Sequence, residues 1–204
     1  FNRFVLAGYK LVQTWSGFVY HMTCRGSRFA DGAKRNPNGE VFMKNRETDE
    51  WLQQNNRSTR NFIRKWGHFV KHDALLKPII PPKYDIGFVV KNCPHSTLYE
   101  LEPWCSTIYT DWGHKTYITT EQENTLFDLN DRVKSRIEDT PDNDIVVEFN
   151  AQEFTNEQFN IIAQLSEILA NDDELEVGEF NLGMFKITVN KIKTYEKELI
   201  VCKQ

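Results

Sequence analysis

Short apolar blocks separated by polar turns fill the second part of the chain. Residues 85–91 and 106–110 are two such blocks, and their length and their aromatic and β-branched content predict strands. Residues 97–104, between them, have the pattern of a short helix in which Glu100 is placed for a capping box. A strand–helix–strand unit of this kind predicts a parallel pair joined by a right-handed crossover.

Two further helices and a buried strand follow in the pattern. Residues 123–137 gather apolar side chains on one face and predict a helix, whereas the block at residues 144–149 predicts a buried strand. Thr155 and Gln158 have the spacing of a capping box at the start of the next helix. The apolar faces consist of Leu126, Leu129, Val133 and Ile137 in the first helix, and of Phe159, Ile162, Leu165 or Ser166, and Leu169 in the second.

The end of the chain alternates in hydropathy as strands do. Apolar positions recur from residue 176 to residue 201, and Asn181, Leu182 and Gly183 have the composition of a hairpin turn. A last apolar block at residues 199–201 extends the pattern. Residues 81–204 are therefore predicted to form a small α/β domain with an antiparallel hairpin at its edge.

The chain begins with an amphipathic segment. Phe1, Phe4 and Val5 have helical spacing, and Gly8 is suited to end the helix. Since a domain seldom begins inside a helix, we expect the chain to be part of a longer protein.

Two strands, a long helix and a proline-rich segment are predicted next. The strands lie at residues 10–15 and 17–20, and Thr48 is placed to cap a helix of about 20 residues. Three prolines in residues 72–84 predict an extended path. We place the domain boundary there, between residues 1–80 and residues 81–204.

Charge separates the same two parts. Residues 1–80 carry 14 Lys and Arg against 6 Asp and Glu, whereas the rest of the chain carries 11 against 23. A basic first part suits an anionic ligand, and docking on the acidic second part is the alternative. The basic flank of the long helix is interpreted as solvated, with the border of a phosphate site as the alternative; it comprises Arg57, Arg60, Arg64 and Lys65.

Composition indicates a folded protein without a membrane span. The chain is 40% apolar and shows neither a long apolar run nor a basic–apolar–small opening pattern, so we expect neither a membrane span nor a secretory leader. Its four cysteines are widely spaced, which favours reduced thiols over disulfides or a zinc site. We therefore expect a cytoplasmic protein.

The strongest candidate chemistry follows the strand at residues 17–20. A polar loop there holds His21, Arg25, Ser27 and Arg28, whose side chains suit an anion or a metal. The alternative is that His21 caps the strand and that the arginines are solvated. The P-loop and the G-x-G-x-x-G motif are both missing from the sequence.

At AGYKL and the following FVYHMTCRGSRF, the chain resembles the C-terminal edge of the catalytic domain of family 2 glycosyltransferases of the GT-A type, in bacteriophage and environmental microbial sequences. The resemblance covers residues 1–30 well and residues 47–85 loosely. It implies that His21 lies at the divalent metal or the nucleotide diphosphate, and that Arg25, Ser27 and Arg28 bind substrate. The implied cofactor of the full-length enzyme is manganese or magnesium.

The resemblance also implies what this chain lacks. The Asp-x-Asp metal motif and the general base of the family would precede Phe1, so we expect these residues to be inactive alone. The full-length enzyme would bind a nucleotide-sugar and a glycan acceptor. Residues 81–204 would then be an accessory domain that positions the acceptor or mediates assembly, and a homo-oligomer is one form of that assembly.

A secondary candidate site follows the strand at residues 106–110. Asp111, Trp112 and His114 lie where open α/β sheets bind ligands. The competing hypothesis for the whole chain is a non-catalytic α/β interaction or structural module. Nucleic-acid binding is disfavoured by the overall acidity and by the absence of interleaved basic and aromatic strand positions.

Overall fold

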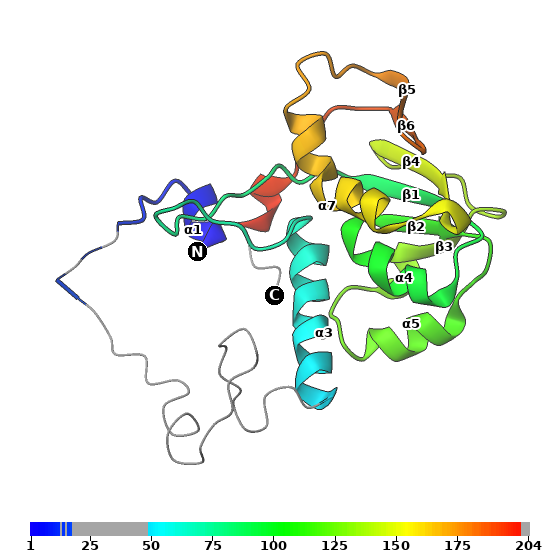
Figure 1. Ribbon diagram of the computed structural model, residues 1–204, viewed down its shortest axis with the longest axis horizontal. Helices are drawn as coiled ribbons and strands as arrows, with labels where there is room; N and C mark the ends of the chain where they lie inside the picture. The colour runs from blue at the N-terminus through cyan, green and yellow to red at the C-terminus, as the bar shows by residue number, and fades with distance from the viewer. Residues whose placement is uncertain (13, 15, 18–48, 201–204) are drawn as a thin grey trace. The chain divides into compact units, whose positions relative to one another are not determined.

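The computed structural model describes residues 1–12, 14, 16–17 and 49–200 (Figure 1). Its contacts divide the chain into two units: Phe1–Lys10 with Thr59–Gln204, and Leu11–Ser58. Helix α3, Asp49–Trp66, begins in the second unit, and from Thr59 onward it belongs to the first. Its length agrees with the predicted helix. The sheet and the remaining described helices belong to the first unit.

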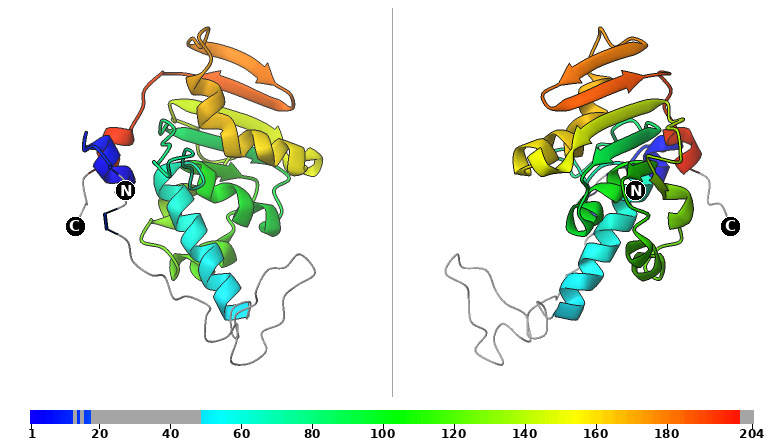
Figure 2. Two further views of the ribbon diagram at one scale, coloured as in Figure 1. Left: turned by 60° about the vertical axis from the view of Figure 1, so that its left-hand side comes forward. Right: turned by 90° about the vertical axis from the view of Figure 1, so that its right-hand side faces the viewer.

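A six-stranded mixed sheet organises this unit, in the order β3-β2-β1-β4-β6-β5. Strands β1, β2, β3 and β4 are mutually parallel, whereas β6 runs antiparallel to both β4 and β5. Both views of Figure 2 show β5 and β6 at the edge of the sheet beyond β4. The strands are β1 Ile86–Lys91, β2 Thr107–Thr110, β3 Val133–Ser135, β4 Ile145–Asn150, β5 Gly178–Leu182 and β6 Phe185–Val189. The predicted α/β fold with an antiparallel edge pair is therefore confirmed.

One face of the sheet carries the main core. Register places Val133 beside Ile108, Ile108 beside Phe88, and Phe88 beside Val147. Ile187 continues this apolar row, which belongs to a single buried cluster. Because side chains alternate along a strand, the row fixes which residues face the helices.

Helices α3, α4, α5, α6 and α7 all contribute side chains to that cluster. Thr155 and Gln158 form the predicted capping box of α7, and Ile162, Leu165, Ser166 and Leu169 form its buried face, as expected. The helices after α3 are α4 His95–Leu101, α5 Lys115–Gln122, α6 Leu129–Arg132 and α7 Asn156–Ala170, with 3-10 turns η1 Glu102–Trp104, η2 Ala151–Glu153 and η3 Glu196–Leu199.

The opposite face of the sheet has a small cluster of Val89, Tyr109 and Val146. The connection from β3 to β4 passes near it, since the Tyr109 hydroxyl bonds Asn143 at 3.3 Å. Asn143 also donates to Asp85 at 2.8 Å. Gly87 lies directly under this amide, because a Cβ built on Gly87 would come within 2.2 Å of Asn143 Oδ1.

The helix predicted at residues 123–137 is wrong. That segment contains a turn, then α6, then β3. The Gln122 side chain holds the turn by donating to Phe127 O and accepting from Leu129 N, both at 2.9 Å. Val133 then pairs with β2 as a strand, and Leu126 is fully exposed. Sheet pairing thus overrides a helical period.

Three smaller predictions also differ from the structure. Helix α4 begins after Pro94 without a side-chain cap, so the capping box through Glu100 is wrong. Pro94 itself occupies the N-cap position, with an extended backbone. Leu199 ends the turn η3 and is not in a strand. In the predicted strand at residues 10–15, the described residues are not in a strand either.

Near the chain start, helix α1, Asn2–Leu6, matches the predicted amphipathic segment. Gly8 follows it with φ of 82°, the left-handed conformation that ends a helix. In the part of the chain that the structure describes, no helix is long and apolar enough to cross a bilayer.

Candidate functional site

A buried ionic network lies between α3 and the helices around the sheet. Arg64, on the face of α3 that meets the core, donates to Glu102 at 2.7 and 2.9 Å and to Glu121 at 2.7 Å. Arg132 pairs with Glu102 from the other side. Arg60 makes a two-pronged contact with Glu121, with both bonds at 2.7 Å.

This network corrects the interpretation of the basic flank of α3. The side chains of Arg64 and Glu102 have no exposed surface, and that of Arg60 is 20% exposed. Arg60 and Arg64 are therefore not solvated. They dock on acidic residues of the second part of the chain, as the alternative interpretation of the charge asymmetry proposed.

The network sets the protonation of its members. Burial opposes ionisation of Glu102, but the charges of Arg132 and Arg64 outweigh it and hold its pKa below the usual value. Burial likewise opposes ionisation of Glu121, whose pKa the bonds from Arg60 and Arg64 lower. Tyr117 donates to Glu102 at 2.8 Å, and burial and that carboxylate raise the pKa of its phenol.

The network contains more cations than anions. Three arginines meet two glutamates, and Lys83 lies beside them with Arg132 as a repelling neighbour. Among the residues that the structure describes, no carboxylate bonds the Lys83 amine, which donates instead to the Arg64 carbonyl at 3.2 Å. A buried excess of positive charge is unfavourable without an anion.

A cavity of about 650 Å³ opens onto this excess charge. Its lining brings together five cations, two hydroxyl groups, several apolar side chains and one carboxylate, that of Glu198. We call it the basic pocket. Its lining residues are Arg3, Arg64, Lys65, Lys83, Ser106, Leu126, Phe127, Arg132, Tyr195, Glu198 and Leu199.

The parallel strands position this pocket. Lys83 lies shortly before β1, Ser106 directly precedes β2, and Arg132 directly precedes β3. Because these strands are parallel, the amino ends of all three lie on the same side of the sheet, at the ends of the strands. The pocket is therefore built from the starts of three strands, and sequence reasoning missed it because β3 was predicted as helix.

Lys83 is a strongly perturbed group of the pocket. Its side chain passes under Gly67, where a Cβ would come within 3.2 Å of Lys83 Cδ. Burial, and then the charge of Arg132, lower the pKa of the amine to about 8. A bound anion would reverse this shift, because it favours the charged amine.

The secondary candidates follow the carboxyl end of β2, opposite the amino ends that form the basic pocket. Asp111 accepts the N–H of Asn92 and pairs with Arg136, so its carboxylate is occupied within the fold. Trp112 is 65% exposed. His114 begins α5 in a left-handed conformation and faces His95, with the ring centroids 6.3 Å apart.

These three residues therefore share a loop but have different surroundings. Burial, and then His95, lower the pKa of His114. At the junction of β1 and β4, where ligands bind in many open sheets, Asn92 donates to Asn150 at 3.1 Å.

The primary sequence candidates His21, Arg25, Ser27 and Arg28 lie outside the described residues. Among the residues that are described, no group of three or more His, Cys, Asp or Glu could hold a metal ion. The described part thus offers no donor set for the divalent metal that the resemblance implies. Cys93 and Cys105 are free and buried, and burial raises the pKa of each thiol to about 12.

Comparisons with protein-family models, with curated proteins and with solved structures found no match to this chain. Function is therefore inferred from the chemistry of the basic pocket.

Proposed function

We propose that the basic pocket binds a phosphate-bearing ligand. The observation that carries the proposal is the amine of Lys83, which lies in a cavity beside three arginines. Arginine forks and a lysine point charge together are the usual donors to phosphate oxygens. Arg64 and Arg132 are already paired with Glu102, whereas among the described residues the Lys83 amine donates only to a backbone carbonyl, so an anionic ligand group suits the pocket best at Lys83.

The rest of the lining favours a ligand with a less polar portion. Ser106 and Tyr195 supply hydroxyl groups, whereas Leu126, Phe127 and Leu199 supply apolar surface. A mixed lining of this kind suits a phosphate ester better than inorganic phosphate.

Glycosyl transfer, which the resemblance implies, remains a proposal of this kind. A nucleotide-sugar donor carries a diphosphate, which is a ligand of the proposed chemistry. In that reaction the basic pocket would contribute phosphate binding. A non-catalytic module that recognises a phosphorylated partner is the alternative with the same pocket chemistry.

Calorimetric titration with pyrophosphate, and separately with UDP, tests the proposal. We expect dissociation constants of roughly micromolar to millimolar size that weaken as salt is added. Lys83→Met should weaken binding at least about tenfold, since it removes a charge-assisted hydrogen bond. Lys91→Met is the matched control, because Lys91 is exposed at the other end of β1.

Two results would contradict phosphate binding: no heat with either ligand, or equal affinities for the wild type and Lys83→Met. Tighter binding of UDP than of pyrophosphate would support a role for the apolar wall. Equal binding of the two would restrict recognition to the phosphates.

A further inference from the structure

Strand β5 forms an open edge of the sheet. It is the last strand in the order, and within the described residues it pairs with β6 on one side and with no strand on the other. Antiparallel pairing uses the N–H and C=O groups of every second residue, so the residues between them turn their backbone groups outward. We call β5 and the residues that lead into it, 172–182, the β5 edge.

The β5 edge lacks two features that commonly protect an edge strand against pairing. Residues 171–182 contain neither lysine nor proline, which block the approach of a further strand in many sheets. Glu179 and Asn181 are exposed in the strand, and Val177, which directly precedes it, is 64% exposed. The backbone of β5 is therefore accessible to a further strand.

The charge of the β5 edge is acidic. From residue 137 to residue 185 the sequence contains 13 Asp and Glu but neither Lys nor Arg. Five of these carboxylates lie at the β5 edge, and one of the five, Glu179, pairs with Lys186 at 3.1 Å. The other four are exposed and form no ion pair with any residue that the structure describes: Asp172, Asp173, Glu174 and Glu176.

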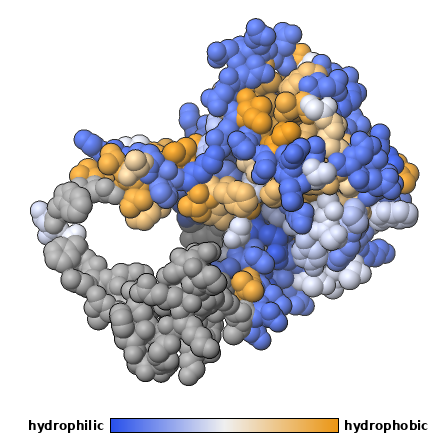
Figure 3. All heavy atoms as spheres, viewed as in Figure 1, coloured by the Kyte–Doolittle hydropathy of each residue, from blue (hydrophilic) through white to orange (hydrophobic). Residues whose placement is uncertain are grey.

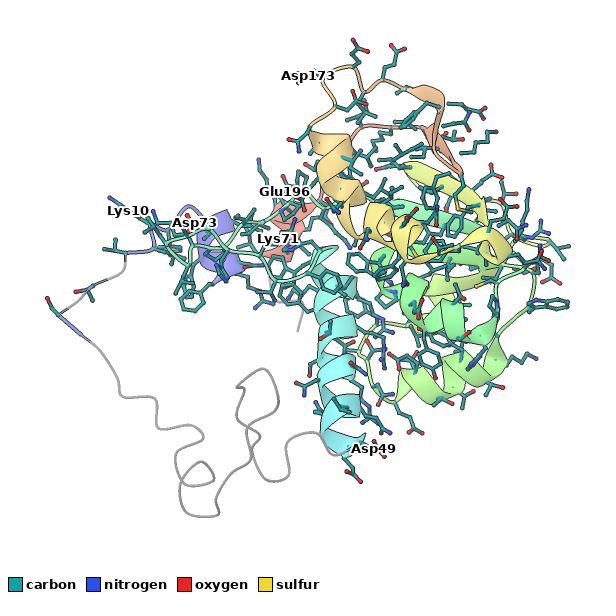
Figure 4. The ribbon with its side chains drawn as sticks, in the orientation of Figure 1. Lys10, Asp49, Lys71, Asp73, Asp173 and Glu196 are labelled. Atoms are coloured by element: carbon teal, nitrogen blue, oxygen red, sulfur yellow. The ribbon has the colours of Figure 1, made fainter. Side chains whose placement is uncertain are left out.

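These four carboxylates lie in the connection from α7 to β5. Figure 4 shows Asp173 in this connection, at the top of the view, and Figure 3 shows hydrophilic surface in the same region. Asp172 holds its own turn, since its carboxylate accepts from Glu174 N at 3.0 Å. The carboxylates of Asp173, Glu174 and Glu176 are thus available to a partner.

The connection begins at the C-terminal end of α7, where acidic side chains are unfavourable. The last carbonyl groups of a helix carry partial negative charge, and lysine or arginine is commonly found near them. The last turn of α7 has no basic residue, and Asp172, Asp173 and Glu174 come directly after its C-cap, Asn171. A cation from another molecule would relieve this repulsion.

Charge and geometry together select the occupant of the β5 edge. In the part of the chain that the structure describes, no group of three or more His, Cys, Asp or Glu could hold a metal ion, so these carboxylates do not form a chelating site. A second copy of the chain would bring a second acidic edge, and lipid phosphates and nucleic acids are negatively charged as well. A strand with lysine or arginine side chains satisfies both the open backbone groups and the carboxylates.

We propose that the β5 edge binds a lysine- and arginine-rich extended segment of a partner protein. The segment pairs with β5 as an added strand, and its cations meet Asp173, Glu174 and Glu176. The proposal does not rest on the basic pocket, because no residue of the β5 edge lines that cavity.

Fluorescence anisotropy with a labelled peptide of alternating lysine and valine tests this proposal. The peptide should bind the purified chain at low salt, and its affinity should fall as salt is added. A peptide with glutamate in place of lysine should not bind. Amide hydrogen exchange of β5, followed by NMR, should slow when the lysine peptide is bound, since the outward N–H groups acquire acceptors.

A variant with fewer charges tests the carboxylates. Glu174→Gln with Glu176→Gln should weaken binding at least about fivefold, because two exposed ion pairs are lost. Asp172 is left unchanged because it holds the turn. The matched control, Glu123→Gln with Glu138→Gln, removes the same charge at exposed positions outside the β5 edge and should change the affinity less than about twofold.

Methylated peptides separate strand pairing from attraction by charge. Two peptides carry N-methyl groups on alternate residues, one on each set, so both keep their lysines but one of them loses the donors that face β5. At least one of them should therefore bind much more weakly than the parent peptide. The proposal is overturned if the parent peptide does not bind, if the Glu174→Gln, Glu176→Gln variant binds it as well as the wild type does, or if both methylated peptides bind as well as the parent.

Discussion

Arg64 and Glu102, 38 residues apart in the chain, form an ion pair in which neither side chain is exposed. Glu102 also holds Arg132, so a single carboxylate links α3 to the segment before β3. The pair joins the basic first part of the chain to its acidic second part. Arg64 and Arg132, which both bond Glu102, also line the basic pocket.

Removing the charge of Glu102 should therefore destabilise the fold strongly. Glu102→Gln leaves two buried arginines short of a counter-charge, and we expect a loss of about 3–5 kcal/mol in the free energy of unfolding. Urea unfolding followed by circular dichroism measures it. Lys186→Ala removes an exposed ion pair with Glu179 and should barely move the urea midpoint. Similar midpoints for the two variants would contradict the central role of the network.

The same carboxylates should make the fold sensitive to acid. The pKa values of Glu102 and Glu121 are lowered in the folded state, so their stabilisation is complete above their unfolded value of 4.5. It is lost as the pH falls through the lower folded values, because the unfolded chain then binds more protons. Urea midpoints measured from about pH 5 to pH 3 should fall more steeply for the wild type than for Glu121→Gln. Glu123→Gln, at an exposed position nearby, should keep the wild-type slope.

Lys83 should have the opposite effect on stability. Its pKa falls from 10.5 to about 8 in the folded state, so the charged amine costs free energy below pH 8 and the wild type gains stability as the pH rises to 10.5. Lys83→Met should stabilise the ligand-free protein at pH 7 by roughly 1–2 kcal/mol and should flatten this rise. Thermal unfolding across that range checks both effects. A less stable variant at pH 7 would mean that the bond to the Arg64 carbonyl outweighs the buried charge.

An anion bound in the basic pocket should reverse that cost. Because the ligand raises the pKa of Lys83, binding near pH 8 should take up a fraction of a proton. The apparent enthalpy of binding pyrophosphate should then vary with the ionisation enthalpy of the buffer. Lys83→Met should remove this dependence, and a dependence that persists would assign the proton to another group.

Gly87 should tolerate no side chain while Asn143 keeps its position. A Cβ at residue 87 would meet Asn143 Oδ1 at 2.2 Å, so Gly87→Ala should cost about 1–3 kcal/mol. In a double-mutant cycle, Gly87→Ala combined with Asn143→Ala should cost less than the two single changes added together. Gly113→Ala is the control, since nothing lies within 4 Å of its Cβ. Strict additivity would show that the two residues do not interact.

The sequence by itself determined the elements whose signals are local. The capping box of α7 lies within four consecutive positions, and β1, β2, β4 and the closing hairpin are short apolar blocks bounded by turns. The α/β class and the antiparallel edge followed from the order of these blocks. Gly8 marked the end of α1 because a left-handed residue is needed there.

Only the tertiary structure decided which residues meet. Arg60 and Arg64 have the periodicity of a solvated helix flank, and their burial depends on Glu102 and Glu121, up to 61 residues away. Val133 fits a helical period, but it lies in a strand because β3 pairs in parallel with β2. The basic pocket combines residues that precede three different strands, and their neighbourhood exists only once the strands lie parallel. A local sequence pattern determines whether an element is a helix or a strand only where its neighbours agree. Residues distant in sequence determine which buried charges are paired and which residues line the basic pocket.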